Sequence, residues 1–152
     1  MNDDLRELLA SLNSANVEFL VIGAHAVGFY VRPRMTEDID LWVNPTPENA
    51  NRLKEALAAF GAPIGDAGAK KFHEGSRDMV RIGVPPNMVD ILNFASSKGF
   101  ARMWSNRVPG QLGGLEVFFP SRTDLTQIKR EAGRPQDLVD AARLEAQDEL
   151  KQ

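Results

Sequence analysis

The chain has 152 residues, of which 43% are hydrophobic and 26% are charged. This is the composition of a globular protein and enough sequence for one domain with its own core, so we expect a single domain over 1–152. The absence of cysteine excludes a disulfide framework, a thiol nucleophile and a cysteine-ligated zinc site.

The 18 basic and 21 acidic residues give a net charge of −3, which provides no general attraction to nucleic acids or anionic membranes. A polyanionic partner would therefore need a local basic patch. The N-terminal residues lack the basic start and apolar run of a signal peptide, and no apolar run approaches the length that spans a bilayer. We expect a soluble, cytoplasmic protein with no membrane partner.

Apolar spacing along the chain predicts a mixture of helices and strands. Spacings of three and four predict helices over 3–13, 24–30, 47–60, 97–106, 122–132 and 135–150. Apolar and β-branched runs predict strands over 17–22, 38–43, 79–84, 87–94 and 115–119. This pattern indicates the α+β class. The strands 79–84 and 87–94, separated by two prolines, are expected to form an antiparallel pair.

Two segments are predicted to be irregular. Residues 62–78 are small, polar and glycine-rich, which predicts a mobile loop with at most a short helical piece. Such a loop is either a functional lid or a solvated connection. The segment from Gly110 to Gly114 predicts a turn before the last strand.

Three aspartates are the candidate functional residues. Asp38 and Asp40 are two positions apart on a predicted strand, so their side chains point to the same face. Asp90 interrupts an otherwise apolar strand, where an acid needs a cation, a metal or hydrogen bonds. Clustered carboxylates repel one another and favour a hard divalent ion, so we expect all three to bind Mg²⁺ or Mn²⁺. The alternative for any single acid is a solvated sheet face.

The turn at Gly23 is the second candidate feature. A short helix that starts directly after the strand 17–22 would present free backbone N–H groups at the carboxyl end of that strand. A phosphate could bind there, beside the acids. The alternative is an ordinary strand-to-helix turn.

These residues together resemble the DNA polymerase β-like nucleotidyltransferase superfamily. The resemblance rests on Gly23-Ala24-His25-Ala26, on Arg34-x-Thr36-x-Asp38-Ile39-Asp40-Leu41 and on Val89-Asp90-Ile91-Leu92. The chain is most similar to minimal bacterial members related to abortive-infection and type IV toxin–antitoxin nucleotidyltransferases. In those proteins Lys129 and the segment Gly133-Arg134-Pro135-x-Asp137-Leu138-x-Asp140 have similar counterparts. The similarity extends over 19–144.

The resemblance implies a nucleotidyltransferase fold, in which helices flank a mixed sheet, and a toxin-like enzyme that moves a nucleoside monophosphate from an NTP to a hydroxyl or phosphate of RNA or protein. It implies that the three aspartates are catalytic and bind the metal. It also implies a nucleotide-binding set, namely Gly23, Ala24, Arg34, Thr36 and Lys129. A cognate antitoxin or other partner protein is a further implication. The superfamily usually has Gly or Ser where this chain has Ala24, which leaves only backbone donors for a phosphate.

The C-terminal segment fits more than one role. Lys129 either reaches a phosphate or stabilises the negative end of its own helix. Asp137 fits a helix-dipole acid, and Asp140 fits an ion pair with Arg134 or Arg143. The alternative to an enzyme is a weak or inactive nucleotidyltransferase-like module that binds a partner, for which Ala24 is the supporting feature.

Overall fold

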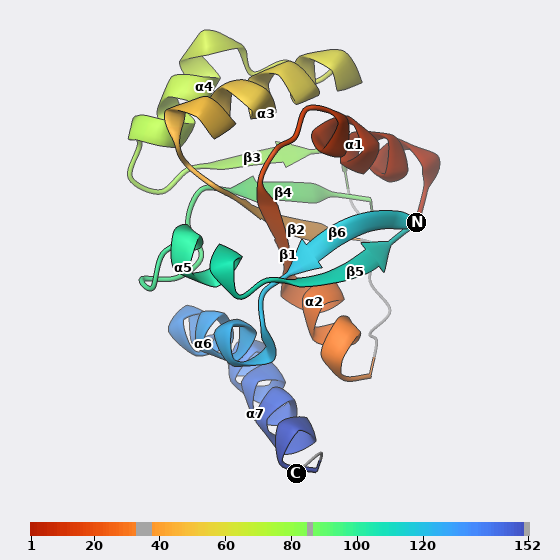
Figure 1. Ribbon diagram of the computed structural model, residues 1–152, viewed down its shortest axis with the longest axis vertical. Helices are drawn as coiled ribbons and strands as arrows, with labels where there is room; N and C mark the ends of the chain where they lie inside the picture. The colour runs from red at the N-terminus through yellow and green to blue at the C-terminus, as the bar shows by residue number, and fades with distance from the viewer. Residues whose placement is uncertain (33–37, 85–86, 151–152) are drawn as a thin grey trace.

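The structure is a computed structural model that describes residues 1–32, 38–84 and 87–150, with side chains as far as residue 146 (Figure 1). A four-stranded sheet forms its centre, in the order β1-β2-β4-β3. β1 (Phe19–Ile22) and β2 (Ile39–Val43) are antiparallel, β2 and β4 (Val89–Leu92) are parallel, and β3 (Met79–Ile82) is antiparallel to β4. The α+β class and the mixed sheet flanked by helices are therefore confirmed.

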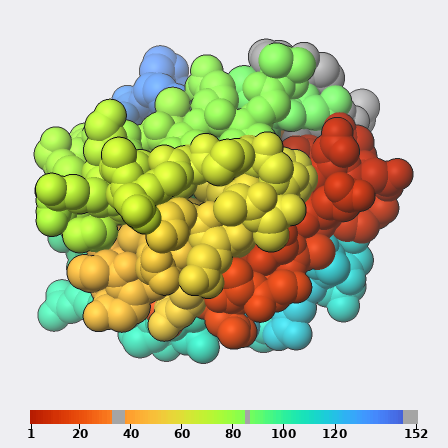
Figure 2. All heavy atoms as spheres, turned by 90° about the horizontal axis from the view of Figure 1, so that it is seen from above, coloured from red at the N-terminus to blue at the C-terminus, as the bar shows by residue number. Residues whose placement is uncertain are grey.

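One face of this sheet is covered by α1 (Asp3–Ser14), α3 (Pro47–Phe60) and α4 (Gly65–Glu74). Figure 2 shows the three helices as one outer surface, with α3 between α1 and α4. Side chains that alternate along the strands join this core, since residues two apart on a strand point to the same side. They include Val21, Leu41 and Ile91, none of which is exposed.

The opposite face of the sheet carries a smaller apolar cluster. Ile22 and Trp42 pack there with Phe100 and Met103 of α5 (Phe100–Ser105) and with Ile128 of α6 (Arg122–Ala132). Asp40 and Asp90 alternate onto this same face. The large core and the acids therefore lie on different sides of the sheet.

Helix ends follow local sequence signals. Thr46 accepts a hydrogen bond from the backbone N–H of Asn49, 3.2 Å away, and Gly61 ends α3 in the left-handed conformation at φ 103°. Ser121 and Gly133 bound α6 in the same way. The helices α2 (Gly23–Tyr30) and α7 (Pro135–Leu150) begin where the sequence predicts.

The prediction for one irregular segment was wrong, and the prediction for the other is confirmed in part. The predicted loop 62–78 contains α4, whose Phe72 is fully buried in the main core. The predicted turn before the last strand is present at Gly113 and Gly114, but it is shorter than expected. Residues 110–112 belong instead to β5 (Val108–Leu112), which pairs with β6 (Leu115–Phe119) in a hairpin. β6 also lies beside β1. Within the described residues, we find no helix both long enough and apolar enough to cross a bilayer.

Candidate functional site

The three predicted acids meet at the edge of the central sheet that is formed by the first residues of β2 and β4 and the last residues of β1. Asp40 lies opposite Asp90 in the parallel pairing of β2 with β4, and Asp38 directly precedes β2. Asp40 is also the register partner of Ile22 on antiparallel β1, so Gly23 follows at this edge. The topology thus brings the acid strand, the third acid and the glycine turn together, as predicted.

Gly23 allows the carboxylate of Asp40 to lie against the start of α2. A Cβ atom at position 23 would be only 2.2 Å from Oδ2 of Asp40, and Gly23 has a φ of 72° that side chains rarely adopt. No side chain caps the N-terminus of α2. The first N–H groups of the helix, which lack intrahelical acceptors, therefore lie beside the acid.

Asp40 sits in an environment that disfavours its charged form. Burial raises the pKa of its carboxyl group most, the negative charge of Asp90 raises it further, and Asp38 adds to the effect. Lys129 and Arg134 act in the opposite direction without cancelling the shift. The edge therefore carries negative charge that the protein neutralises incompletely.

The other two acids have protein partners. Oδ1 of Asp38 accepts a hydrogen bond from the backbone N–H of Met88, at 3.2 Å. Asp90 is bound by Arg81 through both carboxylate oxygens, at 2.8 Å from Nε and 3.2 Å from an Nη atom. The sequence did not single out Arg81. Its only signal was its place in a strand expected to pair with that of Asp90.

The donor chemistry of this edge suits Mg²⁺ or Mn²⁺, because carboxylate oxygens gather there. The ligand geometry is incomplete. Among the described residues, no three His, Cys, Asp or Glu side chains are grouped so that they could hold a metal ion. Asp90 contacts the guanidinium of Arg81 with both of its carboxylate oxygens.

Lys129 is held by two buried acids. Its Nζ lies 3.3 Å from Oδ1 of Asp137 and 3.2 Å from Oδ2 of Asp140, and all three side chains are at most 8% exposed. Arg134 binds the other oxygen of Asp137 at 2.6 Å, and Arg143 lies 3.9 Å from Asp140. Of the two roles predicted for Lys129, the contacts show neither; they show a buried ion network between α6 and α7.

Two hollows adjoin Asp40. Both are lined by Gly23, Asp40, Lys129, Arg134 and Asp137. The larger hollow, about 590 Å³, extends over Arg81 and Asp90 toward the apolar side chains Leu92 and Phe94. The smaller one, about 350 Å³, reaches Ala24, Asp38, Gln136 and Asp140. Asp40 therefore borders both hollows.

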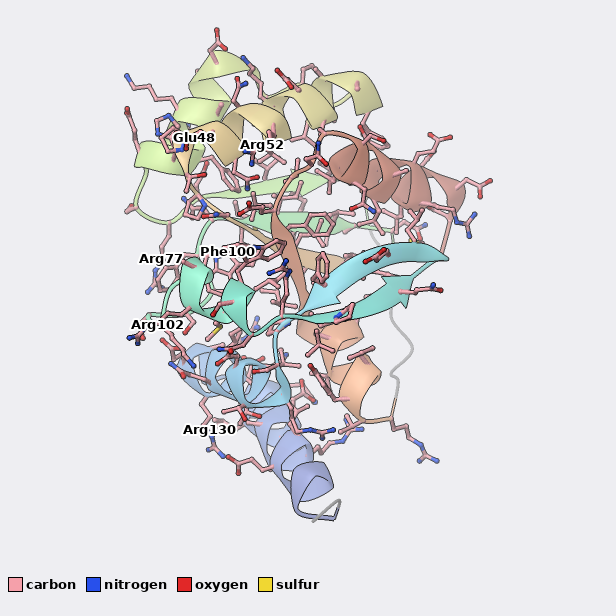
Figure 3. All side chains as sticks on the ribbon, in the orientation of Figure 1. Glu48, Arg52, Arg77, Phe100, Arg102 and Arg130 are labelled. Atoms are coloured by element: carbon pink, nitrogen blue, oxygen red, sulfur yellow. The ribbon has the colours of Figure 1, made fainter. Side chains whose placement is uncertain are left out.

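The rim of the larger hollow carries Arg77, whose guanidinium lies 4.1 Å from the ring centre of Phe94. Figure 3 shows Arg77 at the same side of the molecule as α5. Arg34 and Thr36, which the sequence assigned to nucleotide binding, lie outside the described residues. Gly23, Ala24 and Lys129 all line the smaller hollow.

Neither a protein family nor a curated protein matches the sequence. Among solved structures, an antigenic nucleotidyltransferase-like protein from Paracoccidioides brasiliensis is similar over 97% of this chain and 75% of its own chain. The TM-score is 0.49 and the sequence identity is 14%. A likeness of this degree says nothing about what this chain does, so function has to be argued from the site.

Proposed function

We propose that this protein is a nucleotidyltransferase that uses Mg²⁺ or Mn²⁺ to move a nucleoside monophosphate from an NTP to a hydroxyl or phosphate of RNA or protein. One observation carries the proposal. Asp40 and Asp90 face each other across adjacent parallel strands, directly beside the uncapped start of α2 at Gly23. Acids that hold a cation and backbone donors that hold a phosphate are what a metal-bound nucleotide requires.

The proposed reaction is a displacement at the α-phosphorus of the NTP. An acceptor oxygen forms a bond to that phosphorus, the bond to the oxygen that bridges to the β-phosphate breaks, and pyrophosphate leaves with the electron pair. The proton of a hydroxyl acceptor passes to a carboxylate, for which Asp90 is the predicted base. Catalysis of this kind depends on positioning and charge neutralisation rather than on a covalent enzyme intermediate.

Each part of the site has a role in this scheme. Asp38, Asp40 and Asp90 would hold the divalent cation, which neutralises phosphate charge and favours ionisation of the acceptor. The N–H groups at Gly23 and Ala24 bind phosphate oxygens without help from a side-chain hydroxyl. The apolar wall of the larger hollow, formed by Leu92 and Phe94, excludes water on one side.

The proposal is tested with α-labelled NTPs. Purified protein is incubated with each NTP, Mg²⁺ and cell extract, and label is followed into RNA and protein. We expect transfer by the wild type and none by Asp40→Asn, with both proteins folded by circular dichroism. Absence of transfer with every NTP, together with absence of Mg²⁺-dependent NTP binding in calorimetry, would contradict the enzymatic assignment.

A second candidate function is a nucleotidyltransferase-like module that recruits a partner protein, such as a cognate antitoxin, without catalysis. The observation that favours it is the Arg81–Asp90 pair, in which the guanidinium contacts both carboxylate oxygens of the third acid. The module would co-purify with a partner, and replacing Asp38 and Asp40 together by asparagine would leave that association unchanged. Loss of label transfer in the same double variant would instead support the enzyme.

A further inference from the structure

Arg81 and Asp90 form a cross-strand pair inside the candidate site. They are register partners on β3 and β4, and the guanidinium contacts both carboxylate oxygens, at 2.8 and 3.2 Å. Such two-pronged contacts are the strongest form of carboxylate–arginine pairing. The third acid of the site is therefore already bound to a cation that belongs to the protein.

The pair lies where it interferes with a divalent ion. Arg81 lines the same hollow as Asp40 and Asp90, so its positive charge faces the ion that those acids would hold. A carboxylate with both oxygens engaged by one guanidinium offers a metal few free lone pairs. Asp40 and Asp90 are register partners on adjacent strands, so a cation held by both would lie beside the guanidinium.

The pair is also built so that it can open. The side chain of Arg81 is 52% exposed, whereas that of Asp90 is 17% exposed. β3 is the outermost strand of the sheet, so the long side chain of Arg81 can turn into solvent without disturbing a neighbouring strand. Exposure of the guanidinium to water weakens the pair, which allows a divalent cation to compete for Asp90.

We propose that Arg81 is a built-in competitor of the divalent cation. Asp90 is shared between the guanidinium and the metal, and it becomes a full ligand only when Arg81 leaves. Arg81 thereby sets the metal affinity of the site and restricts the complete ligand set to conditions where the metal is abundant. The inference rests on the cation site of the proposed function, and it assigns to Arg81 control of metal affinity rather than a catalytic role.

The opposite reading is that Arg81 supports the site by orienting Asp90. The two readings predict opposite changes when Arg81 is replaced. If Arg81 competes, its removal frees Asp90 and tightens metal binding. If Arg81 orients Asp90, its removal loosens the carboxylate and weakens metal binding.

The experiment is a titration of the nucleotide-free protein with Mn²⁺, followed by electron paramagnetic resonance and calorimetry. We expect Arg81→Gln to bind Mn²⁺ roughly fivefold more tightly than the wild type, the factor that corresponds to about 1 kcal/mol. The matched control is Arg130→Gln. Arg130 is 51% exposed, pairs with Glu145 and lies outside the hollow, so this substitution removes the same charge at a distance from the site. Unchanged or weaker binding by Arg81→Gln would overturn the inference.

The Asp90→Asn background separates competition for the carboxylate from simple charge repulsion. If Arg81 acts through Asp90, then adding Arg81→Gln to Asp90→Asn leaves Mn²⁺ affinity unchanged. A tightening that persists without Asp90 would contradict the proposed competition.

Asp40→Asn distinguishes the failure of this inference from that of the proposed function. If Mn²⁺ binds in an Asp40-dependent manner but Arg81→Gln has no effect, only the role of Arg81 is wrong. If neither the wild type nor Arg81→Gln binds Mn²⁺ through Asp40, the cation site itself is wrong.

Discussion

The close contact between Gly23 and Asp40 determines the geometry of the whole site. The carboxylate of Asp40 occupies the space that a side chain at position 23 would need. The left-handed backbone of Gly23 turns the chain from β1 directly into α2, so the helix begins beside the acid. Glycine is required here for two independent reasons, backbone conformation and close approach.

The first prediction is that Gly23→Ala disables the site at a greater cost than backbone strain alone. A left-handed alanine costs about 1–2 kcal/mol, and the new methyl group must in addition displace the carboxylate of Asp40. Gly65→Ala is the control, because Gly65 has a φ of 70° with nothing within 4 Å of the added atom. Urea denaturation and Mn²⁺ binding measure the two effects. Equal destabilisation, with Mn²⁺ binding retained by Gly23→Ala, would show that the contact is unimportant.

The second prediction concerns the pH dependence that Asp40 causes. Burial, and then the charge of Asp90, raise the pKa of Asp40 above the ordinary value of 3.8. The native state therefore holds this proton more tightly than the unfolded state, and stability falls as pH rises from 3.8 through the raised pKa. Asp40→Asn removes this penalty, so it should be more stable than the wild type at neutral pH and without metal.

Thermal denaturation between pH 3 and pH 8 checks this sign. The gain from Asp40→Asn should shrink toward zero at the acid end, where the wild-type carboxyl is protonated in both states. Asp66→Asn is the control with the opposite sign, because a hydrogen bond from Lys54 lowers the pKa of Asp66. A loss of stability in Asp40→Asn at neutral pH would contradict the raised pKa.

At the scale of elements, α6 and α7 are joined by the buried network around Lys129. Burial works against the charge of Asp137, yet the contacts with Arg134 and Lys129 lower its pKa. Asp140, whose side chain is fully buried, also accepts a hydrogen bond from Gln136 at 3.0 Å. Lys129 thus binds two buried acids of the next helix, and Arg134 and Arg143 add further positive charge beside them.

The third prediction is that Lys129→Met destabilises the fold strongly. Removing Lys129 takes a cation away from two buried carboxylates that Arg134 and Arg143 then compensate only in part, which costs up to about 3–5 kcal/mol. Arg130→Met is the matched control, since Arg130 bridges the same two helices through an exposed pair with Glu145 and should cost about 1 kcal/mol at most (Figure 3). Urea denaturation compares them. If Lys129→Met were as stable as Arg130→Met but lost NTP binding, Lys129 would act on the substrate alone.

Elements with strong local sequence signals were predicted correctly. The elements that were missed depend on tertiary packing that local signals do not reveal. β2 and β4 were expected because their apolar residues repeat, and α3 because Thr46 and Gly61 mark its ends. α4 was missed because glycines lower its helix propensity, while burial of Ala69 and Phe72 stabilises it through tertiary packing.

β5 was missed for a related reason. Pro109 and Gly110 are typical of turns, but a Cβ atom at Gly110 would lie 2.7 Å from the ring of Phe119 and 2.8 Å from that of Phe29. The two rings stack with centroids 4.3 Å apart. Glycine is needed there for packing against a remote helix, which no local pattern reveals.

The same limit applies to the site. The spacing of Asp38 and Asp40 predicted a shared face, and the strand of Asp90 was expected to be able to lie beside theirs. That the two strands are parallel was not predicted. The contact between Arg81 and Asp90 depends on the register in which β3 pairs with β4. The partners of Lys129 depend on how α6 packs against α7. Neither follows from spacing along the chain.

In the molecule as a whole, the large apolar core and the acidic residues of the candidate site lie on opposite faces of the sheet. The large core beneath α1, α3 and α4 is apolar, and the acids lie on the opposite face beside a small cluster. Repulsion among the acids therefore lowers the free energy of unfolding, whereas the core on the other face raises it. A cation that binds only the native state should raise the free energy of unfolding of the whole molecule.

The fourth prediction is that Mn²⁺ or Mg²⁺ raises the melting temperature of the entire chain in one transition, because ligand binding to the native state stabilises every element that unfolds with it. At a hundredfold excess over the dissociation constant the gain is about 2.7 kcal/mol. Asp40→Asn should start above the wild type in chelator and respond little to metal, so the gap between them closes or reverses as Mn²⁺ rises. Asp66→Asn should follow the wild type, since Asp66 lies on α4 on the other face. Equal shifts in all three proteins would show that the metal binds elsewhere, and the absence of any shift would contradict a cation site at this edge.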